Sequence, residues 1–123
     1  MRALVVDDST SSRAAITGAL GRAGFQVFES GDSVEALDLL EERGDVDLAL
    51  VDWDLPEADG LRFVLGLRSA RGYARTRLIM LTRQPSTAEI LDAIRMGVDD
   101  CIIKPFTREK LQDKLAQLRL RKD

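Results

Sequence analysis

Hydrophobic residues recur along the chain in five short runs, separated by longer segments with helical spacing. The runs occupy residues 3–6, 25–28, 48–51, 78–81 and 101–103. All except the second are uninterrupted by polar residues, which is typical of parallel strands that are covered on both faces. Neighbouring parallel strands need long crossover connections, which the helical segments between the runs can provide.

These intervening segments carry the signals that start and stop helices. Gly24 and Gly44 stand where the first two helices should end. Asp32, Ser86 and Thr107 stand where the second, fourth and fifth should begin. We expect the last helix to end near Arg121. Apolar residues at helical spacing define the expected inner faces: Ala15, Ile16, Ala19, Leu20 and Ala23; Val34, Leu37 and Leu40; Leu61, Val64 and Leu65; Leu91 and Ile94; Leu111, Leu115 and Leu118.

Strand and helix therefore alternate five times, which predicts an open, doubly wound α/β sheet with five parallel strands and five helices. The length of 123 residues fits one domain, and no linker, repeat or low-complexity segment divides it. We predict a single domain over residues 1–123.

The composition excludes several classes of function. A net charge of −3 argues against a basic face for direct nucleic-acid binding. No apolar run approaches the roughly 20 residues that span a bilayer, so no membrane partner is expected. The single cysteine excludes an internal disulfide and fits a reducing compartment, which favours a cytoplasmic location. The absence of histidine excludes a Ser-His-Asp triad and a His-bound zinc site.

Polar side chains follow four of the five predicted strands. Asp7 and Asp8 follow the first, Asp52 the third, Thr82 the fourth and Lys104 the fifth. In a doubly wound sheet, ligands bind beyond the carboxyl ends of the strands, so these five side chains should meet at one edge. Each alone has a common structural explanation, such as a helix cap or a turn, but chance is a poor explanation for the whole set.

This cluster carries an excess of negative charge. Asp7, Asp8 and Asp52 bring −3 when ionised and Lys104 returns +1, which leaves −2. A divalent cation would neutralise that charge, and a set of oxygen ligands favours Mg²⁺, with Mn²⁺ as a second option. We therefore predict a magnesium site between the carboxylates.

The sequence resembles a response-regulator receiver domain of two-component signalling, of the chemotaxis-type single-receiver kind. The matched pieces are "VVDDS" at residues 5–9, "DWDLPEADG" at 52–60, "LT" at 81–82 and "KPF" at 104–106. They occur in the order and spacing of that family over essentially the whole chain. The resemblance implies the flavodoxin-like strand order 2-1-3-4-5.

The resemblance also implies a phosphoacceptor and its metal site. Asp52 would take a phosphoryl group from a phosphohistidine on a sensor histidine kinase or a histidine phosphotransfer protein. Asp8 would bind Mg²⁺ directly and Asp7 mainly through water. Asp52 and the backbone carbonyl of Asp54 would complete the protein's share of the coordination.

Three further positions follow from the same resemblance. Lys104 would pair with phosphoryl oxygens, and Thr82 would turn its hydroxyl toward them after transfer. The peptide bond before Pro105 would be cis and would aim the ammonium of Lys104 into the pocket. The protein would then signal by a conformational change and by docking to a downstream protein target, which the sequence does not name.

Four positions bear on how the phosphorylated state would switch the protein and how long it would last. Cys101 stands where the family commonly has an aromatic residue, so we expect no aromatic-coupled switch; the thiol either packs as a small apolar group or senses redox state. Arg83 stands where the family usually has a small residue. Its guanidinium either adds a cation beside the phosphoryl group or points outward. Asp54 and Gln84 align with the side chains that tune hydrolysis in the family, and both residue types can orient water.

The sequence offers three alternatives to this function. A flavodoxin-type phosphate loop is disfavoured because two acids precede a loop without glycine. A phosphatase of the haloacid-dehalogenase type would need its D-x-D motif after the first strand, whereas here it follows the third. A receiver-like interaction module that is not regulated by phosphorylation stays open. We expect no enzyme activity beyond self-phosphorylation and self-dephosphorylation.

Overall fold

The computed structural model describes residues 1–69 and 75–118, and the expected helix end near Arg121 lies outside them. The strands form one parallel sheet in the order β2-β1-β3-β4-β5, which confirms the predicted fold class. Their bounds are β1 (Arg2–Val6), β2 (Gln26–Ser30), β3 (Leu48–Asp52), β4 (Arg77–Thr82) and β5 (Asp100–Ile103).

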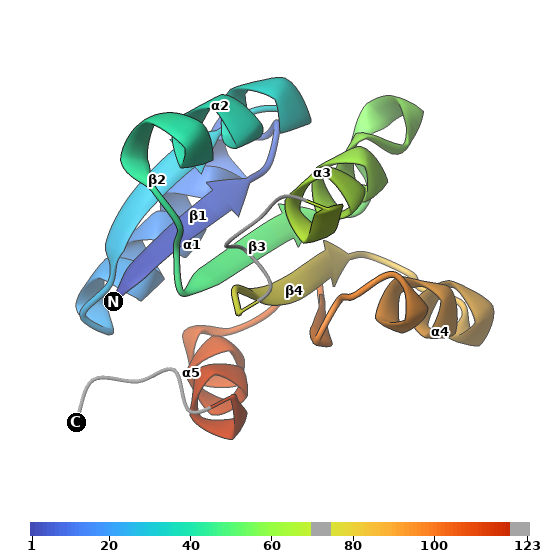
Figure 1. Cartoon of the computed structure of the whole chain (residues 1–123). Helices are drawn as coiled ribbons and strands as arrows, with labels where there is room; N and C mark the ends of the chain where they lie inside the picture. The colour runs from blue at the N-terminus through green and yellow to red at the C-terminus, as the bar shows by residue number, and fades with distance from the viewer. Residues whose placement is uncertain (70–74, 119–123) are drawn as a thin grey trace.

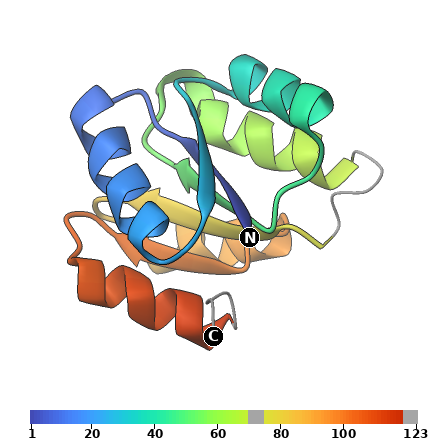
Figure 2. The ribbon, with the colours of Figure 1, turned by 90° about the vertical axis from the view of Figure 1, so that its left-hand side faces the viewer.

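Five α-helices connect the strands and cover both faces of the sheet. They are α1 (Thr10–Arg22), α2 (Ser33–Arg43), α3 (Asp59–Ser69), α4 (Thr87–Arg95) and α5 (Arg108–Gln117), with a short 3₁₀ turn, η1 (Pro56–Ala58), before α3. Helices α1 and α5 lie on one face, and α2, α3 and α4 lie on the other (Figures 1 and 2). None of the helices in the described ranges has the length and apolar character needed to cross a lipid bilayer.

The alternation of side chains along each strand divides the core into two layers. In β1, Leu4 and Val6 pack into the layer beneath α2, α3 and α4. Ala3 and Val5 pack into the layer beneath α1 and α5. Successive strand residues point to opposite faces, so an uninterrupted apolar run serves both layers, as the sequence pattern predicted.

The predicted helix boundaries are confirmed by their capping contacts. The side chains of Asp32, Ser86 and Thr107 each accept a hydrogen bond from a backbone N–H in the first turn of α2, α4 and α5. Gly24 and Gly44 follow α1 and α2 with φ of 95° and 87°, a region that glycine enters without steric cost.

Several predicted inner positions are instead exposed. Val34, in the first turn of α2, is 69% exposed, because the small side chain of Ala36 occupies the position against the sheet. In α4, Ala93 is the buried residue, which leaves Leu91 and Ile94 about half exposed. Three further residues differ in the same way, Ala15 in α1, Leu65 in α3 and Ile103 in the edge strand β5.

Arg68 of α3 holds the carboxyl end of α4 in place. Its Nε and Nη2 donate to the backbone oxygen of Gly97 at 3.0 and 2.8 Å, and Nη2 also donates to Oδ2 of Asp99 at 3.2 Å. The same Asp99 oxygen accepts the N–H of Leu78 in β4 at 2.8 Å. The end of α4 is therefore tied to both α3 and the sheet.

Candidate functional site

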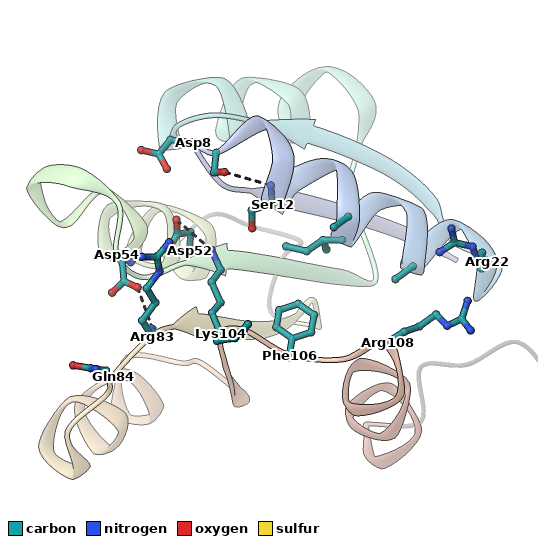
Figure 3. A pocket seen from close by; sticks show the side chains of 15 residues that line it. Asp8, Ser12, Arg22, Asp52, Asp54, Arg83, Gln84, Lys104, Phe106 and Arg108 are labelled. Carbon is teal, nitrogen blue, oxygen red and sulfur yellow. Dashed lines mark hydrogen bonds and ion pairs between the residues drawn. The ribbon is translucent and has the colours of Figure 1, made fainter.

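The polar residues that follow the strands converge at one edge of the sheet. Parallel register pairs Asp52 with Leu81 and Thr82 with Ile103, so these strands end at similar heights. Carboxylate oxygens of Asp7, Asp8 and Asp52 all lie within 4.8 Å of one another. Asp8 and Asp52 line an open pocket of about 1270 Å³, together with residues of the loops after β3, β4 and β5 (Figure 3).

Asp7 is fully buried, and hydrogen-bond donors surround its carboxylate. Oδ1 accepts the Ser9 N–H at 2.9 Å, and Oδ2 accepts the Ser12 hydroxyl at 2.8 Å and the Lys104 ammonium at 2.9 Å. Burial alone would raise the pKa of Asp7. The hydrogen bonds from Lys104, Ser9 and Ser12, together with the charge of Lys104, outweigh burial and lower that pKa below its ordinary value. Asp7 is therefore a carboxylate that stays ionised.

Asp52 is 5% exposed and lies at the end of β3, beside the same ammonium. Its Oδ1 accepts the N–H of Asp54 at 2.9 Å, and its Oδ2 lies 3.6 Å from Nζ of Lys104. Burial raises the pKa of Asp52; the Asp54 N–H and Lys104 partly offset this, whereas the charges of Asp7 and Asp54 add to it. A raised pKa means that the folded protein disfavours the charge on Asp52 until a cation approaches.

Backbone packing fixes the position of Asp52. Gly60, at the start of α3, lies so close that a Cβ there would be 2.7 Å from the backbone oxygen of Asp52. The preceding turn is strained, since Glu57 and Ala58 both have φ of 57°, which L-residues adopt at a cost. The helix therefore begins directly against the end of β3.

Thr82 is buried at the end of β4, and its hydroxyl contacts Asp54. Thr82 Oγ1 donates to Oδ1 of Asp54 at 3.2 Å, and the backbone N–H of Arg83 donates to Oδ2 at 3.1 Å. The carboxylate of Asp54 thus bridges the loops after β3 and β4.

The two modulating residues after Thr82 both line the pocket. Figure 3 shows the Arg83 side chain directed toward Asp52 and Asp54, while Gln84 lies at the outer rim. This arrangement favours the inward orientation of Arg83, in which its guanidinium adds positive charge to the pocket.

Lys104 enters the site from the end of β5. Its N–H donates to the backbone oxygen of Thr82 at 2.8 Å, and its side chain reaches between Asp7 and Asp52. The peptide bond from Lys104 to Pro105 is cis.

Cys101 lies away from this cluster, half-buried in β5 against the layer beneath α4. Burial raises the pKa of its thiol, the charge of Asp100 adds to this, and Lys114 offsets part of it. A raised pKa reduces the reactive thiolate fraction, which favours the packing role over redox sensing.

The structure adds two residues that the sequence reasoning missed. Ser12 binds the carboxylate of Asp7, and Nη1 of Arg13 donates to the backbone oxygen of Asp7 at 2.6 Å while its Nε contacts Glu29 at 3.2 Å. Both residues lie in the first turn of α1, shortly after the acidic pair. Their spacing from Asp7 could have indicated this contact from the sequence.

The donor set suits a hard divalent cation. Asp7, Asp8 and Asp52 offer only oxygen atoms, two of the three side chains are buried, and the pocket beside them is open to solvent. Mg²⁺ prefers such ligands and keeps several waters, for which the open side has room. The residues therefore fit Mg²⁺.

The comparisons with known proteins agree with this arrangement. The family model of the response regulator receiver domain matches residues 3–116. The chain is 40% identical over 119 residues to a chemotaxis protein CheY homolog of Campylobacter jejuni, covering 96% of this chain and 92% of the relative. It is 38% identical over 116 residues to the chemotaxis protein CheY1 of Helicobacter pylori, covering 94% of each.

Solved structures share the fold over nearly the whole chain. Chemotaxis protein CheY4 of Vibrio cholerae superposes with a TM-score of 0.88 at 30% identity, covering 94% of this chain and 96% of that one. The receiver domain of sensor histidine kinase PA1611 from Pseudomonas aeruginosa superposes with a TM-score of 0.82 at 28% identity, covering 94% of each. That structure holds a magnesium ion in its active site cleft.

Proposed function

Because this chain belongs to the response regulator receiver domain family of two-component signalling, we propose that Asp52 accepts a phosphoryl group in a Mg²⁺-dependent reaction. The donor is a phosphohistidine on a sensor histidine kinase or a histidine phosphotransfer protein. Residues 1–123 act as one receiver domain, and the phosphorylated form signals through a conformational change and docking to a downstream protein.

The observation that carries this proposal is the environment of Asp52. Its carboxylate lines the pocket, oriented by the N–H of Asp54 and close to the ammonium of Lys104. Asp7 holds Lys104 on the other side at 2.9 Å. A carboxylate placed in this way can serve as a covalent phosphoryl acceptor.

The residues of the site promote phosphoryl transfer mainly by holding the reacting groups in position and by neutralising charge. A carboxylate oxygen of Asp52 forms a bond to phosphorus while the bond from phosphorus to the donor nitrogen breaks, and the leaving imidazole takes a proton from solvent. Lys104 neutralises charge on the phosphoryl oxygens, and Arg83 adds a second positive group at the pocket. Mg²⁺, when bound by Asp8, Asp52 and the backbone carbonyl of Asp54, with Asp7 acting mainly through water, supplies further neutralisation of that charge.

The proposal is tested by incubating the protein with acetyl phosphate and following covalent modification by intact-mass spectrometry. We expect modification of the wild type with Mg²⁺, little with EDTA, and none in Asp52→Asn. Asp38→Asn removes an exposed carboxylate from α2 and should be modified like the wild type.

Two outcomes would contradict the proposal. Full modification of Asp52→Asn would place the phosphoryl group elsewhere. Unmodified wild-type protein, with acetyl phosphate or a phosphorylated histidine donor, would instead favour the interaction module that is not regulated by phosphorylation.

A further inference from the structure

Both carboxylate oxygens of Asp54 are used to connect two loops of the site. Oδ1 accepts the hydroxyl of Thr82 at 3.2 Å, and Oδ2 accepts the backbone N–H of Arg83 at 3.1 Å. Asp54 also contacts the phosphoacceptor, since its own N–H donates to Oδ1 of Asp52 at 2.9 Å. One residue therefore touches both Asp52 and the Thr82 hydroxyl, which the resemblance to receiver domains directs toward the phosphoryl group after transfer (Figure 3 shows Asp52, Asp54 and Arg83).

A threonine hydroxyl has one hydrogen to donate, so it serves one acceptor at a time. Thr82 is 2% exposed, which leaves water little access to this hydroxyl. The carboxylate of Asp54 and a phosphoryl oxygen on Asp52 are both anionic acceptors, and they would compete for the same hydrogen. The 3.2 Å contact is longer than the usual O–H···O hydrogen bond, so a phosphoryl oxygen at ordinary distance can displace it.

We propose that Asp54 is a positioning residue that holds the Thr82 hydroxyl away from Asp52 until a phosphoryl group competes for it. This inference rests on the proposed function, because it needs a phosphoryl group on Asp52. The carboxylate of Asp54 biases the protein toward the unphosphorylated arrangement of the β4–α4 loop. Removing that carboxylate favours the arrangement in which Thr82 faces Asp52.

The test measures the affinity for beryllofluoride, a non-covalent mimic of the phosphoryl group, in the presence of Mg²⁺. Trp53 is the single tryptophan and follows Asp52 directly, so its fluorescence is a local readout. Asp54→Ala removes the acceptor but keeps the backbone N–H that orients Asp52. Thr82→Val removes the hydroxyl but keeps the branched shape of the buried side chain.

We expect Asp54→Ala to tighten mimic binding about 3–10-fold in the wild-type background, from the release of one charge-assisted hydrogen bond. In the Thr82→Val background the same change should alter affinity less than about twofold, because the competition no longer exists. Thr82→Ser keeps the hydroxyl and should restore the larger effect of Asp54→Ala.

A charge control separates this competition from simple electrostatics. Glu57→Ala removes a carboxylate from the same loop. Glu57 and Asp54 are both exposed, so the two variants differ in the bond from Thr82 to Asp54 and not in exposure. We expect that control to change mimic affinity less than about twofold, as exposed charges are screened. If Asp54→Ala unfolds the protein, Asp54→Asn provides a second variant with one acceptor oxygen in place of two.

The outcomes separate the two proposals. An equal effect of Asp54→Ala in the wild-type and Thr82→Val backgrounds, or weaker binding in both, overturns the role of Asp54 while leaving the phosphoacceptor intact. Wild-type protein that binds no beryllofluoride with Mg²⁺ present overturns the proposed function itself.

Discussion

Asp52→Asn is expected to stabilise the metal-free protein at neutral pH, although it removes the proposed phosphoacceptor. The wild-type carboxylate is 5% exposed and shares its surroundings with two other acids. Asparagine keeps an oxygen that can accept the Asp54 N–H, but it carries no charge. The substitution therefore removes an unfavourable charge while it preserves the shape of the site.

The size of the effect follows from the distances. At an effective dielectric of about 20, Lys104 at 3.6 Å from Oδ2 favours the charge on Asp52 by about 4.6 kcal/mol. A carboxylate neighbour such as Asp7 at the 4.8 Å limit disfavours it by about 3.5 kcal/mol. These two nearly cancel, so the desolvation of a buried ion decides the sign. We expect Asp52→Asn to raise the free energy of unfolding by about 1–2 kcal/mol, and the melting temperature by roughly 3–10 °C.

The effect should depend on pH in a defined direction. Asp52 has a folded-state pKa above its ordinary value of 3.8, so the wild type loses stability as pH rises from that value through the raised pKa. Below this window Asp52 is protonated in both states, and the advantage of asparagine should vanish. Urea unfolding in EDTA, followed by Trp53 fluorescence at about pH 3 and pH 7, measures the stability difference below the window and at neutral pH.

An exposed acid provides the control. Asp38→Asn on α2 should change stability by less than about 0.5 kcal/mol at either pH. Equal or lower stability of Asp52→Asn at neutral pH would refute the reasoning, as would an advantage of the same size at about pH 3. Added Mg²⁺ should reduce the difference in free energy of unfolding between Asp52→Asn and the wild type, because the wild type binds the cation more tightly and is stabilised more by it.

Three further substitutions test the site and its support, each by urea unfolding in EDTA. Lys104→Ala should lower the free energy of unfolding by about 3 kcal/mol, because it leaves Asp7 buried without its countercharge. Glu57→Gly should raise it by about 0.5–1 kcal/mol, since glycine adopts φ of 57° without steric cost. Gly60→Ala should lower it by about 2 kcal/mol, because the new Cβ would lie 2.7 Å from the backbone oxygen of Asp52.

Matched controls make the same kind of substitution at positions outside the site, so that site-specific effects can be separated from those of the residue change itself. Lys110→Ala removes an exposed ammonium from α5 and should be nearly neutral. Glu41→Gly in α2 should destabilise, since glycine in a helix weakens it by about 1 kcal/mol. Gly21→Ala in α1 meets no neighbour within 4 Å and should stabilise. A loss for Glu57→Gly, or a gain for Gly60→Ala, would contradict the backbone argument for that turn.

The layered fold was predictable because its apolar runs are uninterrupted and its helix ends carry caps. The inner faces of the helices were harder to predict from the sequence. In α2 and α4 the small residues Ala36 and Ala93 pack against the sheet, while larger neighbours such as Val34 and Ile94 face outward. Hydrophobicity alone does not reveal which apolar residues of a helix face the sheet, since Leu40 of α2 is buried while Val34 of the same helix is exposed.

Most of the site was predictable for a topological reason, since parallel strands bring the residues that follow them to one edge. The detailed contacts were not. The bond from Thr82 to Asp54 depends on side-chain rotamers and loop geometry, which no local pattern encodes, whereas the bond from Ser12 to Asp7 follows the place of Ser12 in the first turn of α1. Likewise, the left-handed backbone at Glu57 stands directly before the close approach of α3 to β3, and neither feature has a signal in the sequence.

The attachment of α4 at one end has a consequence for its local unfolding. Its carboxyl end is fastened by Arg68, whereas Ala93 is its one fully buried residue among those described, against four in α3. Amide protons near Ser86 should therefore exchange with solvent faster than those near Met96, because the Ser86 cap at the amino end is exposed, whereas Arg68 ties the other end to α3. The amino end adjoins the loop carrying Thr82, so the most labile turn of the helix lies nearest the proposed chemical event.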